Sequence, residues 1–248
     1  MISIRRPDEV ALIRESGRLV AGALELAGSM VRPGVTTGQI DEEIESFIRG
    51  HGATPEFKGY HGYPAATCTS VNEEVVHGIP GTRELRDGDI VGVDVGVRRD
   101  GYVGDGAATF AVGEISDEAV QLLEGTRASL KAGLSIAKDG VHLSDVSHAI
   151  QSHAESAGYS VVRELAGHGV GRELHEAPEV PNFGPPGFGP ILKAGMVLAV
   201  EPMVNAGRPE VATLDDGWTV VTADGRLSAH FEHSVVVTAD GIEILTAP

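Results

Sequence analysis

The sequence is poor in cysteine, in long apolar runs and in positive charge, and each shortage excludes something. Cys68 is the only cysteine in 248 residues, so no disulfide forms within the chain and a reducing compartment is expected. No apolar run approaches the roughly 18 residues of a membrane span. Residues 1–8 lack the apolar stretch of a signal peptide. We therefore expect a cytoplasmic protein with no membrane partner.

Positive charge is outnumbered almost two to one. The chain has 19 Lys and Arg against 36 Asp and Glu, which gives a net charge of −17. A field of that sign repels phosphate backbones, so DNA is not an expected partner. The hydrophobic fraction of 42% and the charged fraction of 22% are typical of a globular protein. The length suits one large domain or two small ones.

Helical segments occur in two similar pairs. Pro7 opens the first helix, and Thr36 with Gln39 forms a capping-box pattern at the start of the second. The same order returns at Asp117, where a third helix begins, and a fourth follows the break at Gly140. Chance similarity between two amphipathic helix pairs is the alternative to a true repeat.

Strand-like segments follow each helix pair. They cover about 67–77, 90–97 and 102–112 in the first half, and about 159–166, 196–205 and 229–237 in the second. The pattern predicts a single α+β domain over residues 1–248, with pseudo-repeat halves at about 7–112 and 117–237. We expect the strands to join into one curved sheet with the helices on one face.

Three carboxylates interrupt apolar strands, at Asp94, Glu201 and Glu232. An unpaired carboxylate in a desolvated strand is costly or becomes neutral. One of them could be a local salt bridge, but with Asp105 and His168 the set needs a shared cation. A pair of divalent metal ions is the simplest one, and such ligands suit Mn, Fe, Co or Zn. No HExxH or CxxC motif is present, which argues against a mononuclear zincin or a zinc finger.

A predicted β-hairpin brings Asp94 and Asp105 close together. Asp100-Gly101 is the signal for a two-residue turn. Pairing of Arg99 with Tyr102 then puts Asp94 and Asp105 on one face, about 7–8 Å apart at the backbone. A three-residue loop would put them on opposite faces, and Asp94 alone could equally be a structural salt bridge or an N-cap.

His168 lies in a glycine-rich run, Gly167-His168-Gly169-Val170-Gly171. The run could cradle a phosphate, although its spacing is not that of the dinucleotide fingerprint.

Six segments together resemble type I methionine aminopeptidase, and the likeness runs nearly end to end. They are residues 59–64, 70–80, 167–171, 175–178, 201–203 and 231–233. The family has the pita-bread fold, a pseudo-two-fold α+β domain with a curved, mostly antiparallel sheet. The resemblance implies removal of the initiator methionine from nascent proteins and peptides whose second residue is small. It implies water activated by two divalent metal ions.

The resemblance also implies a role for each ligand. Asp94 would chelate one metal, and Asp105 and Glu232 would bridge both. His168 and Glu201 would complete the second metal, with Glu201 also the general base.

Two further histidines gain catalytic and substrate-binding roles from the resemblance. His175 would steady the carbonyl oxygen as it becomes an oxyanion, and His77 would approach the leaving amide nitrogen. Either histidine alone would more often be an ordinary core or loop residue.

The corresponding methionine pocket is apolar and aromatic, as an unbranched thioether needs. Its implied wall consists of Tyr60, Tyr63, Cys68, Leu174 and Trp218. Cys68 could be read as a catalytic thiol, but no base is assigned to it. Trp218 could simply pack in the core.

Some residues depart from the family pattern. Gly96 and Gly106 stand where many members carry a hydroxyl residue, which puts metal affinity in question. Phe57 and Leu174 are expected to reshape the pocket mouth. His230 and His233 match no family ligand, and we expect them in an outer shell or at the surface.

Two other functions compete with this interpretation. An Xaa-Pro peptidase of the prolidase group shares the fold and all five ligands, but such enzymes usually carry a further N-terminal domain. A non-catalytic binding protein on the same scaffold would have lost ligands. We expect a monomer acting on nascent polypeptide or peptide substrates, with ribosome contact left open.

Overall fold

The computed structural model describes residues 2–247, and its helices form the two predicted pairs. They are α1 (Pro7–Met30), α2 (Thr37–Gly50), α3 (Asp117–Ile136) and α4 (Leu143–Ser156), with a short 3₁₀ turn η1 (Tyr60–Gly62). The capping box at α2 is confirmed, because the backbone N–H of Thr36 donates to the Gln39 side chain and that of Gln39 to the Thr36 hydroxyl. No helix among these residues is both long and apolar enough to cross a membrane.

Among residues 2–247, fifteen strands, most of them short, make up the rest of the regular structure. They are β1 (Thr54–Pro55), β2 (Cys68–Val71), β3 (Glu74–Val76), β4 (Ile90–Arg99), β5 (Tyr102–Ala111), β6 (Ser160–Val161), β7 (Ala166–Gly169), β8 (Glu176–Pro181), β9 (Val197–Val200), β10 (Met203–Asn205), β11 (Val211–Thr213), β12 (Val220–Thr222), β13 (Ser228–His230), β14 (His233–Val237) and β15 (Ile242–Ile244). All six predicted segments contain strands. The segment 159–166 reaches β7 only at Ala166, and β1, β8, β11, β12 and β15 were not predicted.

Hydrogen-bond ladders divide these strands into four sheets. One contains β1, β4, β2 and β5, and another has the order β15-β14-β9-β7-β8. Two three-stranded sheets, β13-β10-β6 and β11-β12-β3, flank them. Every strand pair among residues 2–247 is antiparallel, which agrees with the predicted α+β class. The expected single sheet is thus divided, because hydrogen bonding between strands is not continuous from one sheet to the next.

The two larger sheets meet where β5 lies against the start of β14, and we call this contact the seam. The Ser234 hydroxyl accepts from the Asp105 backbone N–H at 3.0 Å and donates to the Asp105 carbonyl at 2.7 Å. The backbone N–H of Glu232 donates to the Ala107 carbonyl at 2.9 Å. One side chain therefore replaces part of a ladder, which is why the strands do not form one continuous sheet.

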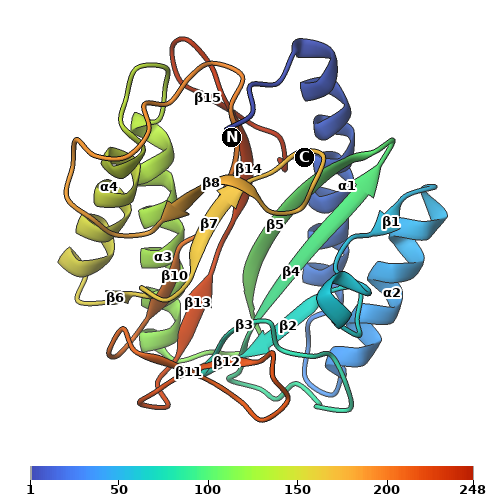
Figure 1. Ribbon diagram of the computed structural model, residues 1–248. Coiled ribbons are helices and arrows are strands. Elements are labelled where there is room, and N and C mark those ends of the chain that lie inside the picture. Colours follow the sequence, from blue (N-terminus) through green and yellow to red (C-terminus); the bar gives the residue numbers. More distant parts are fainter. Residues whose placement is uncertain (1, 248) are drawn as a thin grey trace.

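Each helix pair packs on its own set of strands. Helix α1 contacts β4 and β5, whereas α3 contacts β10 and β13. Figure 1 shows α1 and α2 at the right of the view and α3 and α4 at the left, with the long strands between the two pairs. Most of one buried cluster comes from the first half, including Ile40 and Val93, and most of another from the second, including Leu122 and Ile150. A third buried cluster draws on both halves and includes Tyr63, Cys68 and Leu174.

The β4–β5 hairpin has the predicted register. Arg99 pairs with Tyr102, and Asp94 pairs with Ala107. Asp100 and Gly101 have φ values of 50° and 81°, as the two central residues of a type I′ turn require. Asp94 and Asp105 therefore share one face of the hairpin.

Candidate active site

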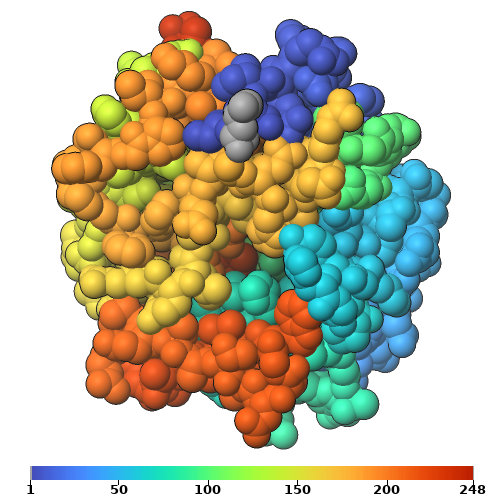
Figure 2. All heavy atoms as spheres, in the orientation of Figure 1, coloured from blue at the N-terminus to red at the C-terminus, as the bar shows by residue number. Residues whose placement is uncertain are grey.

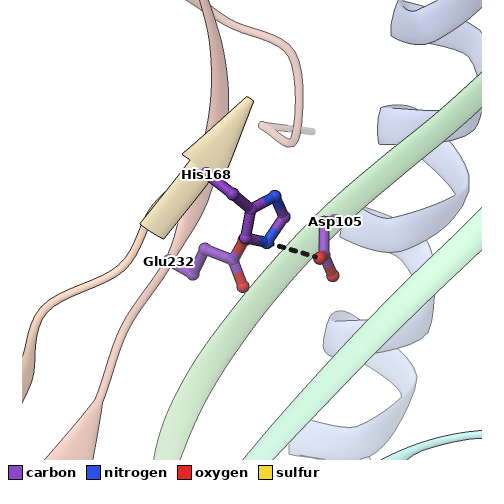
Figure 3. A group of neighbouring side chains, drawn as sticks. All are labelled: Asp105, His168 and Glu232. Carbon is purple, nitrogen blue, oxygen red and sulfur yellow. Dashed lines mark ion pairs between the residues drawn. The ribbon is translucent and has the colours of Figure 1, made fainter. Parts of the chain in front are cut away.

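Three buried side chains converge at the seam. Asp105 of β5, His168 of β7 and Glu232, which precedes β14, each offer one ligand atom within 4.8 Å of the others. Figure 3 shows the three side chains turned toward one another from separate segments of the chain. His168 Nε2 lies 3.6 Å from Asp105 Oδ2 and 3.4 Å from Glu201 Oε1. Both larger sheets thus contribute to one cluster.

The carboxylates of this cluster lack the partners that buried acids need. Asp94 Oδ1, Asp105 Oδ1 and Glu232 Oε1 are buried without a hydrogen bond. Burial raises the pKa of Asp94 to about 7 and that of Glu201 to about 8. Burial, together with the charges of Asp94 and Glu201, raises the pKa of Asp105 well above its usual range.

Glu232 completes this set, and burial followed by the charge of Asp105 raises its pKa well above the usual range. Among residues 2–247, no Lys or Arg pairs with any of the four acids. A donor set of anionic oxygens and an imidazole fits divalent cations, which would compensate these charges.

His168 is oriented as a metal ligand would be. Its Nδ1 lies 3.0 Å from the Gly169 carbonyl, to which an Nδ1–H donates. The lone pair of Nε2 then faces the carboxylates. Burial, with a contribution from His175, lowers the pKa of His168 to about 4, so the ring is neutral at neutral pH. A backbone carbonyl that fixes the tautomer of a ligating histidine is a common feature of metal sites.

A pocket opens beside the cluster and contains every residue predicted for the site. It is lined by Phe57, Tyr60, Tyr63, Cys68, His77, Asp94, Asp105, His168, Leu174, His175, Glu201, Trp218 and Glu232. Figure 2 shows a hollow near the centre of this face, bordered by gold, teal and orange segments. Its volume of about 130 Å³ is below the roughly 300–1,000 Å³ of sites for drug-sized ligands. The pocket is therefore of a size for one side chain.

Aromatic rings form one wall of the pocket. The Trp218 ring meets the Tyr63 ring edge-on, with centroids 5.1 Å apart, so Trp218 both lines the pocket and packs against a buried cluster that includes Tyr63. The Tyr63 hydroxyl is anchored by the carbonyls of Thr67 and Gly78. Burial raises the pKa of the Cys68 thiol well above its usual range. A protonated thiol is a poor nucleophile, which agrees with a wall position.

The two predicted catalytic histidines reach the pocket from different loops. His175 Nδ1 lies 2.7 Å from the Tyr60 hydroxyl, and its ring is 4.2 Å from that of His168. Burial lowers the pKa of His175. Burial also lowers the pKa of His77, to about 4. Both rings are therefore available as neutral hydrogen-bonding groups.

The two glycines beside the aspartates are explained by their neighbours. A Cβ on Gly96 would lie 2.5 Å from the Phe57 ring, and one on Gly106 would lie 2.9 Å from Val20 Cγ1. Phe57 thus fills the space that a hydroxyl side chain would take at Gly96, and it also lines the pocket.

His230 and His233, both expected in an outer shell or at the surface, lie in different surroundings. His233 contacts Thr246. His230 is not at the surface, because it is buried and its Nε2 lies 3.5 Å from Glu201 Oε2. Strand alternation could have indicated this, since residues 230 and 232 fall on one side of an extended chain.

The fold and the buried donor set define a class, the metal-dependent hydrolases with ligands from several strands. Residues 11–239 match metallopeptidase family M24. The chain is 53% identical to methionine aminopeptidase 1 of Bacillus subtilis over 246 residues, 99% of each chain. It is 45% identical to methionine aminopeptidase of Escherichia coli K12, covering 99% of this chain and 94% of that one. The chain therefore belongs to metallopeptidase family M24, among its methionine aminopeptidases.

Solved structures agree with this assignment. Methionine aminopeptidase from Thermotoga maritima is similar over 100% of both chains, with a TM-score of 0.99 and 46% identity. Prolidase from Pyrococcus furiosus covers 99% of this chain and 65% of its own, with a TM-score of 0.81 and 20% identity. The second likeness shows the shared fold alone. The predicted resemblance and the pita-bread fold are confirmed.

Proposed function

We propose that this chain removes the N-terminal methionine from peptides and nascent proteins whose second residue is small. The observation that carries the proposal is the meeting of buried, unpartnered carboxylates with an aromatic pocket of side-chain size. The whole-chain similarity to methionine aminopeptidases supports the same substrate class. The pocket offers an unbranched thioether soft, polarizable contacts at Cys68 and the rings of Tyr63 and Trp218.

Five side chains would hold the metal ions: Asp94, Asp105, His168, Glu201 and Glu232. Asp105 and Glu232 offer ligand atoms within 4.8 Å of each other, and divalent cations would offset the repulsion between their charges. Two divalent cations would supply Lewis acidity to the scissile carbonyl and to the attacking water. The donor set accepts Co, Mn, Fe or Zn.

Three side chains of the protein would accept the proton of the attacking water and bind the reacting amide. Glu201, whose carboxylate lines the pocket beside His168, would take the proton of the attacking water. His175 holds the carbonyl oxygen through Nε2, because its Nδ1 is engaged by the Tyr60 hydroxyl. His77 lines the same pocket and approaches the amide nitrogen that leaves.

A comparison of substrates tests the proposal. Protein loaded with Mn²⁺ should hydrolyse Met-Ala-Ser, should leave Xaa-Pro dipeptides intact, and should lose activity in EDTA. Exclusive cleavage of Xaa-Pro bonds would favour a prolidase activity instead. A chain that binds no Mn²⁺ or Co²⁺ would favour a non-catalytic role, which the complete ligand set argues against.

We further infer a cytoplasmic, monomeric enzyme that meets its substrates as nascent polypeptides. Sedimentation of the chain by itself and with purified ribosomes tests the oligomeric state and any docking on the ribosome. The net charge of −17 opposes non-specific RNA binding.

A further inference from the structure

His230 is a buried histidine that the proposed function leaves without a task. It ends β13 on the inner side of the seam, and only 3% of its surface is exposed. Its backbone N–H donates to the Thr109 hydroxyl at 2.9 Å, and its carbonyl accepts from that hydroxyl at 2.8 Å. The backbone N–H and carbonyl of His230 are thus both bound to Thr109 of β5. The imidazole itself is enclosed by the protein.

The imidazole points at Glu201. Its Nε2 lies 3.5 Å from Glu201 Oε2 and has no hydrogen-bond partner in residues 2–247. The other oxygen, Oε1, lies 3.4 Å from Nε2 of His168. The Glu201 carboxylate therefore stands between two imidazoles, with one at each oxygen. Only His168 has a role so far.

His230 does not belong to the ligand cluster itself. The side chains whose ligand atoms lie within 4.8 Å of one another are Asp105, His168 and Glu232, and His230 is not among them. Its effect on an ion must pass through Glu201. The charged groups that face it, Glu201 and Asp94, are both acids, so a neutral imidazole places its proton on Nε2 and donates it.

We propose that His230 is a positioning residue, which donates a hydrogen bond from Nε2 to Glu201 Oε2 and thereby aims Oε1 at the ligand cluster. The inference rests on the proposed role of Glu201 as ligand and base. Outer partners of ligating carboxylates orient them and raise metal affinity. The 3.5 Å separation would shorten when a cation draws Glu201 into its coordinating position, since catalytic hydrogen bonds are often long before ligands bind.

Four variants test the proposal. His230→Leu removes the donor with little change in volume, His230→Gln keeps a donor with similar reach, and His230→Asn keeps a polar group that is too short. His233→Leu is the matched control, because it removes the neighbouring histidine, which contacts Thr246 outside the cluster. Each protein is stripped of metal, titrated with Mn²⁺ by calorimetry, and assayed for kcat and KM on Met-Ala-Ser.

We expect His230→Leu and His230→Asn to weaken Mn²⁺ binding and to lower kcat by about 10- to 100-fold. KM should stay nearly constant, and His230→Gln should retain most of the Mn²⁺ affinity and most of the kcat of the parent. His233→Leu should bind Mn²⁺ like the parent. The metal-free His230→Leu protein should unfold at a temperature equal to or above that of the parent, because it loses a buried polar atom that had no partner.

Three results would overturn the proposal. In the first, His230→Leu binds Mn²⁺ and hydrolyses Met-Ala-Ser like the parent. In the second, His230→Gln loses as much Mn²⁺ affinity and kcat as His230→Leu. A lower unfolding temperature in the metal-free variants, with metal binding unchanged, would mean a purely structural role. If His230→Leu does not fold, His230→Asn decides between the same outcomes. A parent that binds Mn²⁺ but spares Met-Ala-Ser would refute the proposed function, while the calorimetric arm would still test His230.

Discussion

The stability of the metal-free protein should fall as pH rises, and divalent metal should restore it. Burial raises the pKa of Asp94 to about 7 and of Glu201 to about 8, against about 4 for the same groups in an unfolded chain. The folded state therefore binds more protons than the unfolded state between about pH 4 and pH 8. Linkage then requires the free energy of unfolding to decrease across that window and to be greatest below it.

The size of this effect follows from the two pKa values. Each lies about three pH units above its unfolded value, and one unit corresponds to about 1.4 kcal/mol, so about 8 kcal/mol is an upper bound for the pair, because the charge of Glu201 contributes to the shift of Asp94. Both side chains line the pocket and keep some contact with water. Screening by that water should reduce the loss to roughly 4 kcal/mol. For a chain of this length, such a loss lowers the unfolding temperature by roughly 10 °C.

Thermal unfolding in EDTA and in excess Mn²⁺, at several values between pH 5.5 and pH 8.0, measures the effect. Bound cations replace the protons, so Mn²⁺ should raise the unfolding temperature more at pH 8.0 than at pH 5.5 and should release protons on binding. Asp94→Asn is the matched variant, because a neutral amide should flatten the pH dependence in EDTA. A metal effect that is equal at both pH values, or larger at the lower one, would refute the reasoning.

Three further perturbations address other parts of the site. Asp105→Asn and Glu232→Gln should each lower bound metal and Met-Ala-Ser hydrolysis by more than about 100-fold, as measured by metal analysis and peptide assay; parental metal content would contradict their role. His175→Ala should lower kcat by about 100- to 1,000-fold while metal content stays unchanged in the same assays. Gly96→Thr should lower the free energy of unfolding by about 1–3 kcal/mol, measured by chemical unfolding, because the new side chain would clash with Phe57. Phe57→Ala in the same protein should remove this clash. If the losses of the two single variants add in the double variant, the clash is not the cause.

Features that depend on neighbouring residues could be predicted from the sequence. The capping box fixed the start of α2, and the Asp100-Gly101 turn fixed the register that pairs Asp94 with Ala107. Both depend on backbone conformations that a few adjacent residues determine. Three of the five proposed ligands, Asp94, Glu201 and Glu232, were noticed because a charge in an apolar strand is conspicuous without any knowledge of its partners, and the structure places all five beside one pocket.

Features that depend on distant contacts were not available from the sequence. The packing of Phe57 on Gly96 joins a loop to a strand, and no local pattern indicates it. The exposed strand β11 and its short partner β12 lack the apolar alternation that reveals a strand. His230 was expected in an outer shell or at the surface; strand alternation could have indicated its inward side, but its contact with Glu201 depends on the fold.

The seam explains why one chain with two similar halves has one site. Asp94 and Asp105 come from the first half, whereas His168, Glu201 and Glu232 come from the second. Where the halves meet, Ser234 binds both backbone groups of Asp105, so the spacing between Asp105 and Glu232 depends on docking and not on a long ladder. Neither half alone could hold two cations, because each supplies acids without the others needed to complete the coordination. We infer that the halves work as a single catalytic domain.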